Sequence, residues 1–259
     1  MDKIISLQIW QLASAYIFIV LLLLIVKLRG IPREKEIIIA SIRMTLQLVL
    51  TGYILMYLFE NSNPVITVLV IVIMEVFAVY NIYKRVKLTL SLKLKKIIAI
   101  AMLTGTTSSL LFFIFVVIHI SPWYDPRYFI PIAGMFIGNS MTGISLGVSR
   151  LVDGITDNRH LIESALMLGA SPKNASREIV NNAFDSAILP TINSMVGMGI
   201  VFLPGMMTGQ ILSGISPITA IEYQIAIMLG ILGSVALSVI LFVQMGYKTF
   251  FNNEHQLNI

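Results

Sequence analysis

Long apolar runs alternate with short polar connections along almost the whole chain, and this alternation predicts an all-α, polytopic membrane protein. A transmembrane helix needs roughly 20 mostly apolar residues. Seven segments meet this requirement, at about residues 6–28, 37–59, 64–83, 97–120, 128–150, 186–212 and 218–246. We therefore expect a single transmembrane domain over residues 1–259, with seven spanning helices.

The basic residues predict which side of the membrane each connection faces, because short loops rich in Lys and Arg stay on the cytoplasmic side. Of the 18 Lys and Arg residues, 15 lie in the first, third and fifth loops and in the C-terminal tail. Lys3 and Arg127 lie on the opposite side, and Arg43 lies within a span. We therefore expect the N-terminus outside and the C-terminus inside. The longest connection, residues 151–185, is then cytoplasmic.

The composition of the chain and the motifs that it lacks exclude several classes of function. Of the 259 residues, 57% are hydrophobic and 12% are charged, and there is no cysteine, which excludes disulfides, thiolate metal sites and a cysteine nucleophile. The sequence has no P-loop, nucleophile elbow or zinc-protease helix. The net charge of +5 reflects the loop asymmetry and does not indicate a nucleic-acid surface. We expect a protein that is not an enzyme, binds no cofactor itself and resides in the lipid bilayer.

The cytoplasmic connection contains a short predicted helix that starts near His160 and is terminated by Gly169 and Pro172. Apolar residues recur along it at helical spacing and leave Glu163 on a polar flank. These apolar residues are Leu161, Ile162, Ala165, Leu166 and Leu168. The helix has two possible uses: it docks into a groove on a partner, or it lies on the lipid headgroups.

Glu163-Ser-Ala165, followed by Leu168-Gly169-Ala170-Ser171, resembles the coupling-helix motif of ABC transporter permeases. In those proteins the helix sits in a cleft of a separate ATP-hydrolysing subunit. The resemblance implies that the contacts to such an ATPase come from Glu163, Ala165, Leu166, Leu168, Gly169 and Ala170.

Most of the chain is similar to the FetB-type (YbbM-like) permeases, a family of bacterial iron exporters with plant relatives linked to aluminium tolerance. The most specific match is the string Leu203-Pro204-Gly205-Met206-Met207-Thr208-Gly209-Gln210-Ile211-Leu212, and further matches include Gly134-Met135, Gly138-Asn139-Ser140-Met141, Tyr223-Gln224 and Arg43 with Gln47-Leu48. The resemblance implies a homodimeric permease of the bacterial plasma membrane. It also implies two copies of a cytoplasmic ATPase that binds ATP-Mg, and a cargo of iron or a related metal that is exported.

Two charged residues, Arg43 and Glu75, lie deep within predicted spans, where a charge must pair or line a wet cavity. Glu75 lies roughly 12 Å and Arg43 roughly 9 Å from the cytoplasmic ends of their helices, at 1.5 Å per residue. Their similar depths predict an Arg43–Glu75 ion pair. The pair either locks two helices together or places Glu75 against a cationic substrate.

The sixth predicted span carries Pro204 and Gly205 at membrane depth, where a broken helix is tolerated only if the freed backbone groups are buried in protein or line a cavity. With Gly209, these residues form a predicted hinge. Methionine sulfurs nearby are either soft metal ligands or ordinary packing groups. The hypothesised substrate path comprises Arg43, Gln47, Glu75, Asn139, Met141, Met206, Met207 and Gln210, with no resident metal site assigned.

Small residues in the fifth span predict close helix packing, through the pairs Gly134 with Gly138 and Gly143 with Gly147.

Two other functions remain open for the chain besides metal export by an ABC transporter. One is an ABC permease for a nucleotide sugar or another organic anion. The other is a secondary transporter or channel that uses Glu75 as an ion relay and needs no ATPase.

Overall fold

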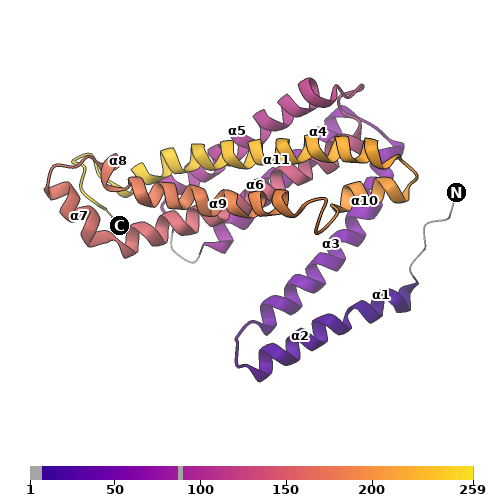
Figure 1. The fold of residues 1–259 in the computed structure, drawn as a ribbon, viewed down its shortest axis with the longest axis horizontal. Coiled ribbons are helices and arrows are strands. Elements are labelled where there is room, and N and C mark those ends of the chain that lie inside the picture. The colour runs from indigo at the N-terminus through magenta and orange to yellow at the C-terminus, as the bar shows by residue number, and fades with distance from the viewer. Residues whose placement is uncertain (1–7, 87–89, 259) are drawn as a thin grey trace. The chain divides into compact units, whose positions relative to one another are not determined.

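The computed structural model describes residues 8–86 and 90–258, so the predicted loop residues Lys3 and Lys87 lie outside the described part. Every regular element in that part is a helix, apart from two isolated β-bridges, Met198–Phe202 and Phe251–Leu257. The predicted all-α class is therefore confirmed. In chain order (Figure 1), the helices are α1 (Ile9–Ala15), α2 (Ile17–Leu28), α3 (Glu34–Glu60), α4 (Pro64–Arg85), α5 (Leu92–Phe112), η1 (Phe113–Ile118), α6 (Pro126–Asp157), α7 (Arg159–Met167), α8 (Pro172–Ala175), α9 (Arg177–Gly197), α10 (Gly205–Leu212), α11 (Pro217–Gly246) and η2 (Tyr247–Phe250).

Six helical stretches in the described part are long and apolar enough to cross a membrane. They are α1 with α2, α3, α4, α5 with the π-helical η1, α6, and α11 with η2. Each corresponds to one of the predicted spans. The chain is therefore a multi-pass membrane protein, but the predicted count of seven spans is not confirmed.

The sixth predicted span, residues 186–212, has no counterpart among these six stretches, because it is not one continuous helix. Helix α9 begins earlier, at Arg177, and ends at Gly197, and α10 begins only at Gly205. Between them, Gly199 has a φ of +82°, a conformation that favours glycine, and its amide donates to the Phe202 carbonyl at 2.9 Å. Pro204, which has no amide proton, precedes α10. The break therefore lies on the N-terminal side of the predicted Pro204–Gly205 hinge.

The chain forms two compact units, the first of which comprises Met1–Asn61 and Leu212–Gly214. Within it, α2 and α3 form an antiparallel pair connected by a turn in which Gly30 has a φ of +65°. The hydroxyl groups of Tyr16 and Thr45 form a hydrogen bond between the two arms of this hairpin. Most of its large apolar side chains are exposed, as expected for helices that contact lipid.

The second unit comprises Ser62–Ile211 and Ile215–Ile259, and α6 and α11 form its centre. Helices α4, α5 and α9 pack around them. Gly143 shows how close these contacts are, since a Cβ there would lie 2.8 Å from Val235 Cγ1 of α11. Gly147 similarly faces Ala187 of α9, so the predicted packing role of this pair is confirmed. Gly138 has open space around its Cβ position, so it makes no such contact.

Several basic residues of the second unit flank the connection between α4 and α5 and lie on α8 and η2. The end of α4 and the start of α5 meet, because the Tyr83 hydroxyl donates to the Lys95 carbonyl at 2.6 Å. Lys173 of α8 and Lys248 of η2 line one groove. The predicted topology places all of these residues on the cytoplasmic side. The orientation in the membrane remains a prediction.

Because the chain contains no cysteine, single cysteines test this orientation without background. We expect a membrane-impermeant maleimide to label Ser62→Cys, in the predicted outer loop, in intact cells. Lys173→Cys, an exposed position of α8, should be labelled only after permeabilisation. Labelling of Lys173→Cys in intact cells would show that the orientation is inverted.

Helices α5 and α11 approach each other closely at Gly105. A Cβ at this position would lie 2.6 Å from the Ser238 Cα atom, so the two backbones would have to separate. We expect Gly105→Ala to destabilise the fold by about 1–3 kcal/mol. The matched control is Gly138→Ala, which meets no atom and should stabilise its helix by up to about 1 kcal/mol. Thermal unfolding in detergent measures the stability of both variants. Equal melting temperatures for the two would refute the close contact between α5 and α11 at Gly105.

Candidate functional site

Helix α7 lies where the sequence predicts the coupling helix. Asn158 is both the C-cap residue of α6 and the N-cap residue of α7, so the two helices follow each other directly. After Met167 the chain turns through Gly169, whose φ is +89°, and the Gly169 amide donates to the Leu166 carbonyl at 2.9 Å. This glycine stop is typical of helix C-termini. The predicted short helix and its termination are confirmed.

Helix α6 extends past its predicted end at residue 150 and reaches Asp157. Leu151, Val152 and Ile155 of this extension are buried. Gly154 lies against α9, since a Cβ on it would be 2.6 Å from Ile179 Cγ2. The first part of the predicted cytoplasmic connection is therefore a packed continuation of α6.

The apolar residues of α7 divide between two faces instead of forming one. Ile162 is buried and Leu166 packs against the hydrophobic core of the second unit. Leu161, Met167 and Leu168 point away from that core, with exposed fractions of 69%, 86% and 89%. One row therefore fixes α7 to the bundle, and the other is available to a partner.

The short helix α8 connects this element to α9. The Ser171 side chain caps α8, and the buried Ser176 hydroxyl donates to the Pro172 carbonyl at 2.7 Å. On α7 itself, Arg159 Nε donates to Glu163 Oε1 at 2.8 Å. Helices α7 and α8 thus form an ordered link between the ends of α6 and α9.

Glu75 of α4 is 4% exposed and contacts α5. Thr106 Oγ1 hydrogen-bonds to Glu75 Oε1 and also lies 2.7 Å from the Met102 carbonyl of its own helix. A hydroxyl carries a single proton, so Thr106 can donate to only one of these oxygens at a time. Glu75 Oε2 is buried and has no hydrogen-bond partner among the described residues. The carboxyl group therefore has unused binding capacity inside the bundle.

The break between α9 and α10 has a second buried polar group beside it. Gln224 of α11 is buried, and its Nε2 atom lies 3.8 Å from Met198 Sδ at the start of the break. In the described part of the chain, Gln224 Oε1 has no hydrogen-bond partner. A broken helix with a buried amide next to it is an arrangement that transporters use for substrate sites or hinges.

The predicted path residues of the second unit lie on α4, α6 and α10 and differ in their burial. Asn139 is exposed on α6, and its amide donates to the Met135 carbonyl at 2.8 Å. Met141 and Met206 pack against the core, and Met207 is buried. Gln210 lies on α10, partly exposed. Arg43 and Gln47 belong to α3 in the first unit, so an Arg43–Glu75 pair remains a prediction.

Sequence reasoning missed Thr106 as the partner of Glu75, and it missed the hydrogen bond of 3.0 Å between the buried hydroxyls of Ser140 and Ser234. Polar residues at positions 104–109, inside an apolar span, were the available signal for Thr106. Within the described ranges, no three His, Asp or Glu side chains gather as a metal site.

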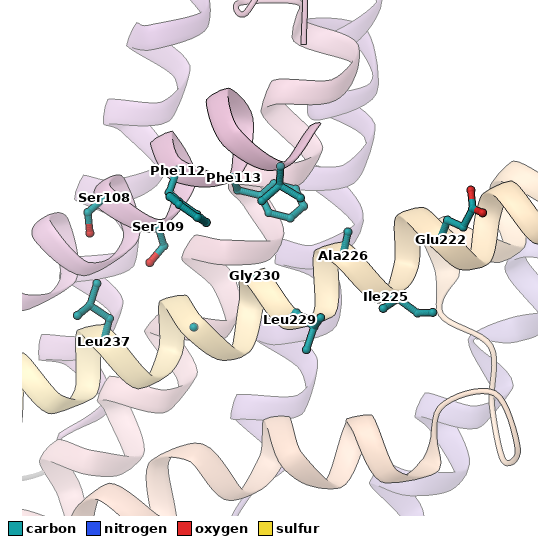
Figure 2. A pocket seen from close by; sticks show the side chains of 12 residues that line it. Ser108, Ser109, Phe112, Phe113, Glu222, Ile225, Ala226, Leu229, Gly230 and Leu237 are labelled. Carbon is teal, nitrogen blue, oxygen red and sulfur yellow. The ribbon is translucent and has the colours of Figure 1, made fainter. Parts of the chain in front are cut away.

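An apolar groove of about 750 Å³ runs between α5 with η1 and α11. Figure 2 shows Phe112 and Phe113 on one side of it and Ala226 and Leu229 on the other. Glu222 is the only charged residue in its lining. A surface of this kind suits lipid tails or another helix, and it offers few ligands to a hydrated metal ion.

Comparison with known proteins identifies the family. A sequence model described as "Uncharacterised protein family (UPF0014)" matches residues 9–251. The chain is 35% identical over 247 residues to the "UPF0014 membrane protein YjkA" of Bacillus subtilis, covering 95% of this chain and 97% of that protein. It is 34% identical over 247 residues to the "Probable iron export permease protein FetB" of Escherichia coli, covering 95% and 93%.

A plant relative, the "Protein ALUMINUM SENSITIVE 3" of Arabidopsis thaliana, is 32% identical over 245 residues, which cover 95% of this chain and 88% of that protein. No solved structure matches the chain significantly. The resemblance to the FetB-type permeases is thus confirmed along nearly the whole sequence. The chain belongs to the UPF0014 family of membrane proteins.

Proposed function

We propose that this permease is the membrane subunit of an ABC transporter and that it exports iron or a related metal. In this proposal two copies of the chain pair with two copies of a separate cytoplasmic ATPase. The observation that carries the proposal is α7, an ordered helix outside the candidate spans whose outer face exposes Leu161, Met167 and Leu168. A sequence without a P-loop needs another subunit to bind ATP.

The connections of α7 support a mechanical role. Because Asn158 joins α7 directly to α6, and Ser176 joins α8 to α9, a displacement of α7 moves the ends of both long helices. Helix α9 leads into the break at residues 198–204. Closure of the ATPase pair would thus change the angle of α9 relative to α10 and switch the path between inward-open and outward-open states.

The cargo is inferred from the relative named as a probable iron export permease. Within the chain, Glu75 provides a buried carboxylate oxygen without a described partner, and Gln224 provides a buried amide oxygen. Carboxylate and amide oxygens are ligands for hard cations, and nearby methionine sulfurs would suit softer ones. We propose Glu75 as the main cation-binding group of the path.

The buried carboxyl group of Glu75 also favours one other function. A buried carboxyl in a membrane span is also what an ion-coupled secondary transporter needs for a relay. Such a protein would move its substrate without an ATPase, and α7 would have no docking role. A requirement for ATP therefore separates the two functions.

Cellular metal content tests the proposed cargo. Cells that lack the gene should accumulate more iron than the parent under iron excess, and the intact chain should reverse this accumulation. Manganese, copper and zinc excess serve as parallel conditions that identify the metal. Unchanged content of all four metals, with and without the gene, would reject metal export as the function.

A further inference from the structure

The C-terminal hairpin, residues 250–258, is a preformed element that lies beside α7. Asn252 fixes it: its Oδ1 accepts from the Glu254 amide at 3.0 Å and the Gln256 amide at 2.8 Å, and its Nδ2 donates to Gln256 Oε1 at 3.0 Å. The Asn258 amide donates to the Phe250 carbonyl at 2.8 Å. Phe250, Phe251 and Leu257 pack against the core. This segment is therefore held by its own hydrogen bonds and by its packing against the core.

Two grooves flank the hairpin, and they carry opposite charges. The groove toward α7 has a volume of about 390 Å³ and includes the carboxylates of Glu254 and of Glu163, the latter in an ion pair with Arg159. The groove toward α8 has a volume of about 520 Å³ and includes the ammonium groups of Lys173 and Lys248. A partner that covers the hairpin thus meets an acidic site on one side and a basic site on the other, which fixes its orientation.

The lining of the α7 groove indicates what enters it. Leu166, Met167, Ala170 and Leu257 form apolar walls, and the two carboxylates stand among them. Met167 is also part of the exposed outer face of α7, so the groove and that face form one continuous surface. Acidic groups disfavour contact with anionic lipid headgroups and favour a basic protein segment.

We infer that the C-terminal hairpin is the second half of the ATPase docking surface, and that the ATPase inserts an apolar side chain flanked by a basic one between α7 and the hairpin. This inference rests on the proposed function. It extends the docking surface to an element that is distant in sequence from α7. It also requires the ATPase to carry a basic residue next to an apolar one at this contact. The hairpin would set the angle at which the ATPase engages, and α7 would receive the force.

Two neighbouring positions provide a matched test, since Glu254 lines the α7 groove and Asn253 lines the α8 groove. Glu254→Gln removes one negative charge and Asn253→Lys adds one positive charge, so each raises the net charge by one unit at an exposed site. The affinity of the full chain in nanodiscs is measured for the ABC ATPase that co-purifies with it. We expect Glu254→Gln to weaken binding about threefold, Glu254→Lys about tenfold, and Asn253→Lys less than about twofold.

A second pair tests the fold of the hairpin. Asn252→Ala removes the side chain that holds the turn and should weaken ATPase binding about tenfold. Asn258→Ala keeps the backbone bond to Phe250 and should bind like the parent. Melting temperatures equal to the parent's show that the bundle itself is intact.

Several results would overturn the inference. If Leu168→Asp abolishes ATPase binding while the Glu254 and Asn252 variants bind normally, α7 docks alone and only the proposed function stands. If Glu254→Lys increases binding to phosphatidylglycerol vesicles without changing the affinity for the ATPase, the hairpin surface contacts lipid. If the parent chain binds no ATPase, the proposed function fails and the inference fails with it.

Discussion

Leu168→Asp will leave the chain folded in the membrane and will abolish metal export. Leu168 is 89% exposed at the end of α7 and makes no contribution to the core, so the substitution costs the isolated chain little. In the docked complex the new carboxylate would be buried against the ATPase without a partner, at a cost of about 3–5 kcal/mol. At about 1.4 kcal/mol per tenfold, binding should weaken by at least about a hundredfold. Co-purification of the ATPase and export of iron from cells measure the two consequences.

The choice of residue matters, because Ile162 and Leu166 of the same helix face the core and their substitution would disturb the fold. The matched control is Leu92→Asp, which introduces the same charge at the first residue of α5, at a site that is 77% exposed. This variant should retain ATPase binding and export. Parental export by Leu168→Asp would show that α7 does not transmit the energy of ATP hydrolysis.

Glu75→Gln will preserve the fold and reduce export about tenfold or more. An amide has nearly the same shape, and it can donate to Thr106 Oγ1 while Thr106 donates to the Met102 carbonyl, so both hydrogen bonds form together. Replacing a buried carboxyl by a neutral amide also removes the cost of burying a charge. The melting temperature should therefore equal or exceed that of the parent. Export falls because the cation loses its charged ligand.

Thr106→Val is the control that separates structure from transport. It removes the only hydroxyl that the described residues place on Glu75 and should destabilise the fold by about 1–3 kcal/mol. Parental export together with a lower melting temperature for Glu75→Gln would assign Glu75 to a helix-locking ion pair. If Glu75→Gln has both the export and the melting temperature of the parent, Glu75 neither locks the helices nor binds the cation.

The spans and the end of α7 could be predicted from the sequence because they depend on local properties. Length and apolar content identify α3 to α6 and α11, and Gly169 with Pro172 identifies the stop of α7. Pro204 and Gly205 predicted a broken helix, but the sequence did not show that the break begins at Met198, since the residues before Pro204 are mostly apolar. The continuation of α6 to Asp157 depends on packing against α9, which is a tertiary effect.

The candidate site required contacts that are distant in sequence. Thr106 reaches Glu75 across 31 positions, and Ser140 reaches Ser234 across 94 positions. Spacing within one helix carries no information about such pairs. The two-faced character of α7 was also hidden, because helical periodicity shows which residues share a face but not whether two adjacent rows serve different partners. The hairpin at residues 250–258 gave no apolar period and so was not predicted as an element.

ATP-driven metal movement in inside-out vesicles is the most direct test of the central claim, that this permease is powered through α7 by a separate ATPase. Vesicles containing the parent chain and the co-purifying ATPase should accumulate iron when ATP is supplied, and neither subunit alone should support accumulation. Leu168→Asp should reduce accumulation to the level without ATP. Accumulation that proceeds without ATP and follows an imposed ion gradient would contradict the account and identify a secondary transporter.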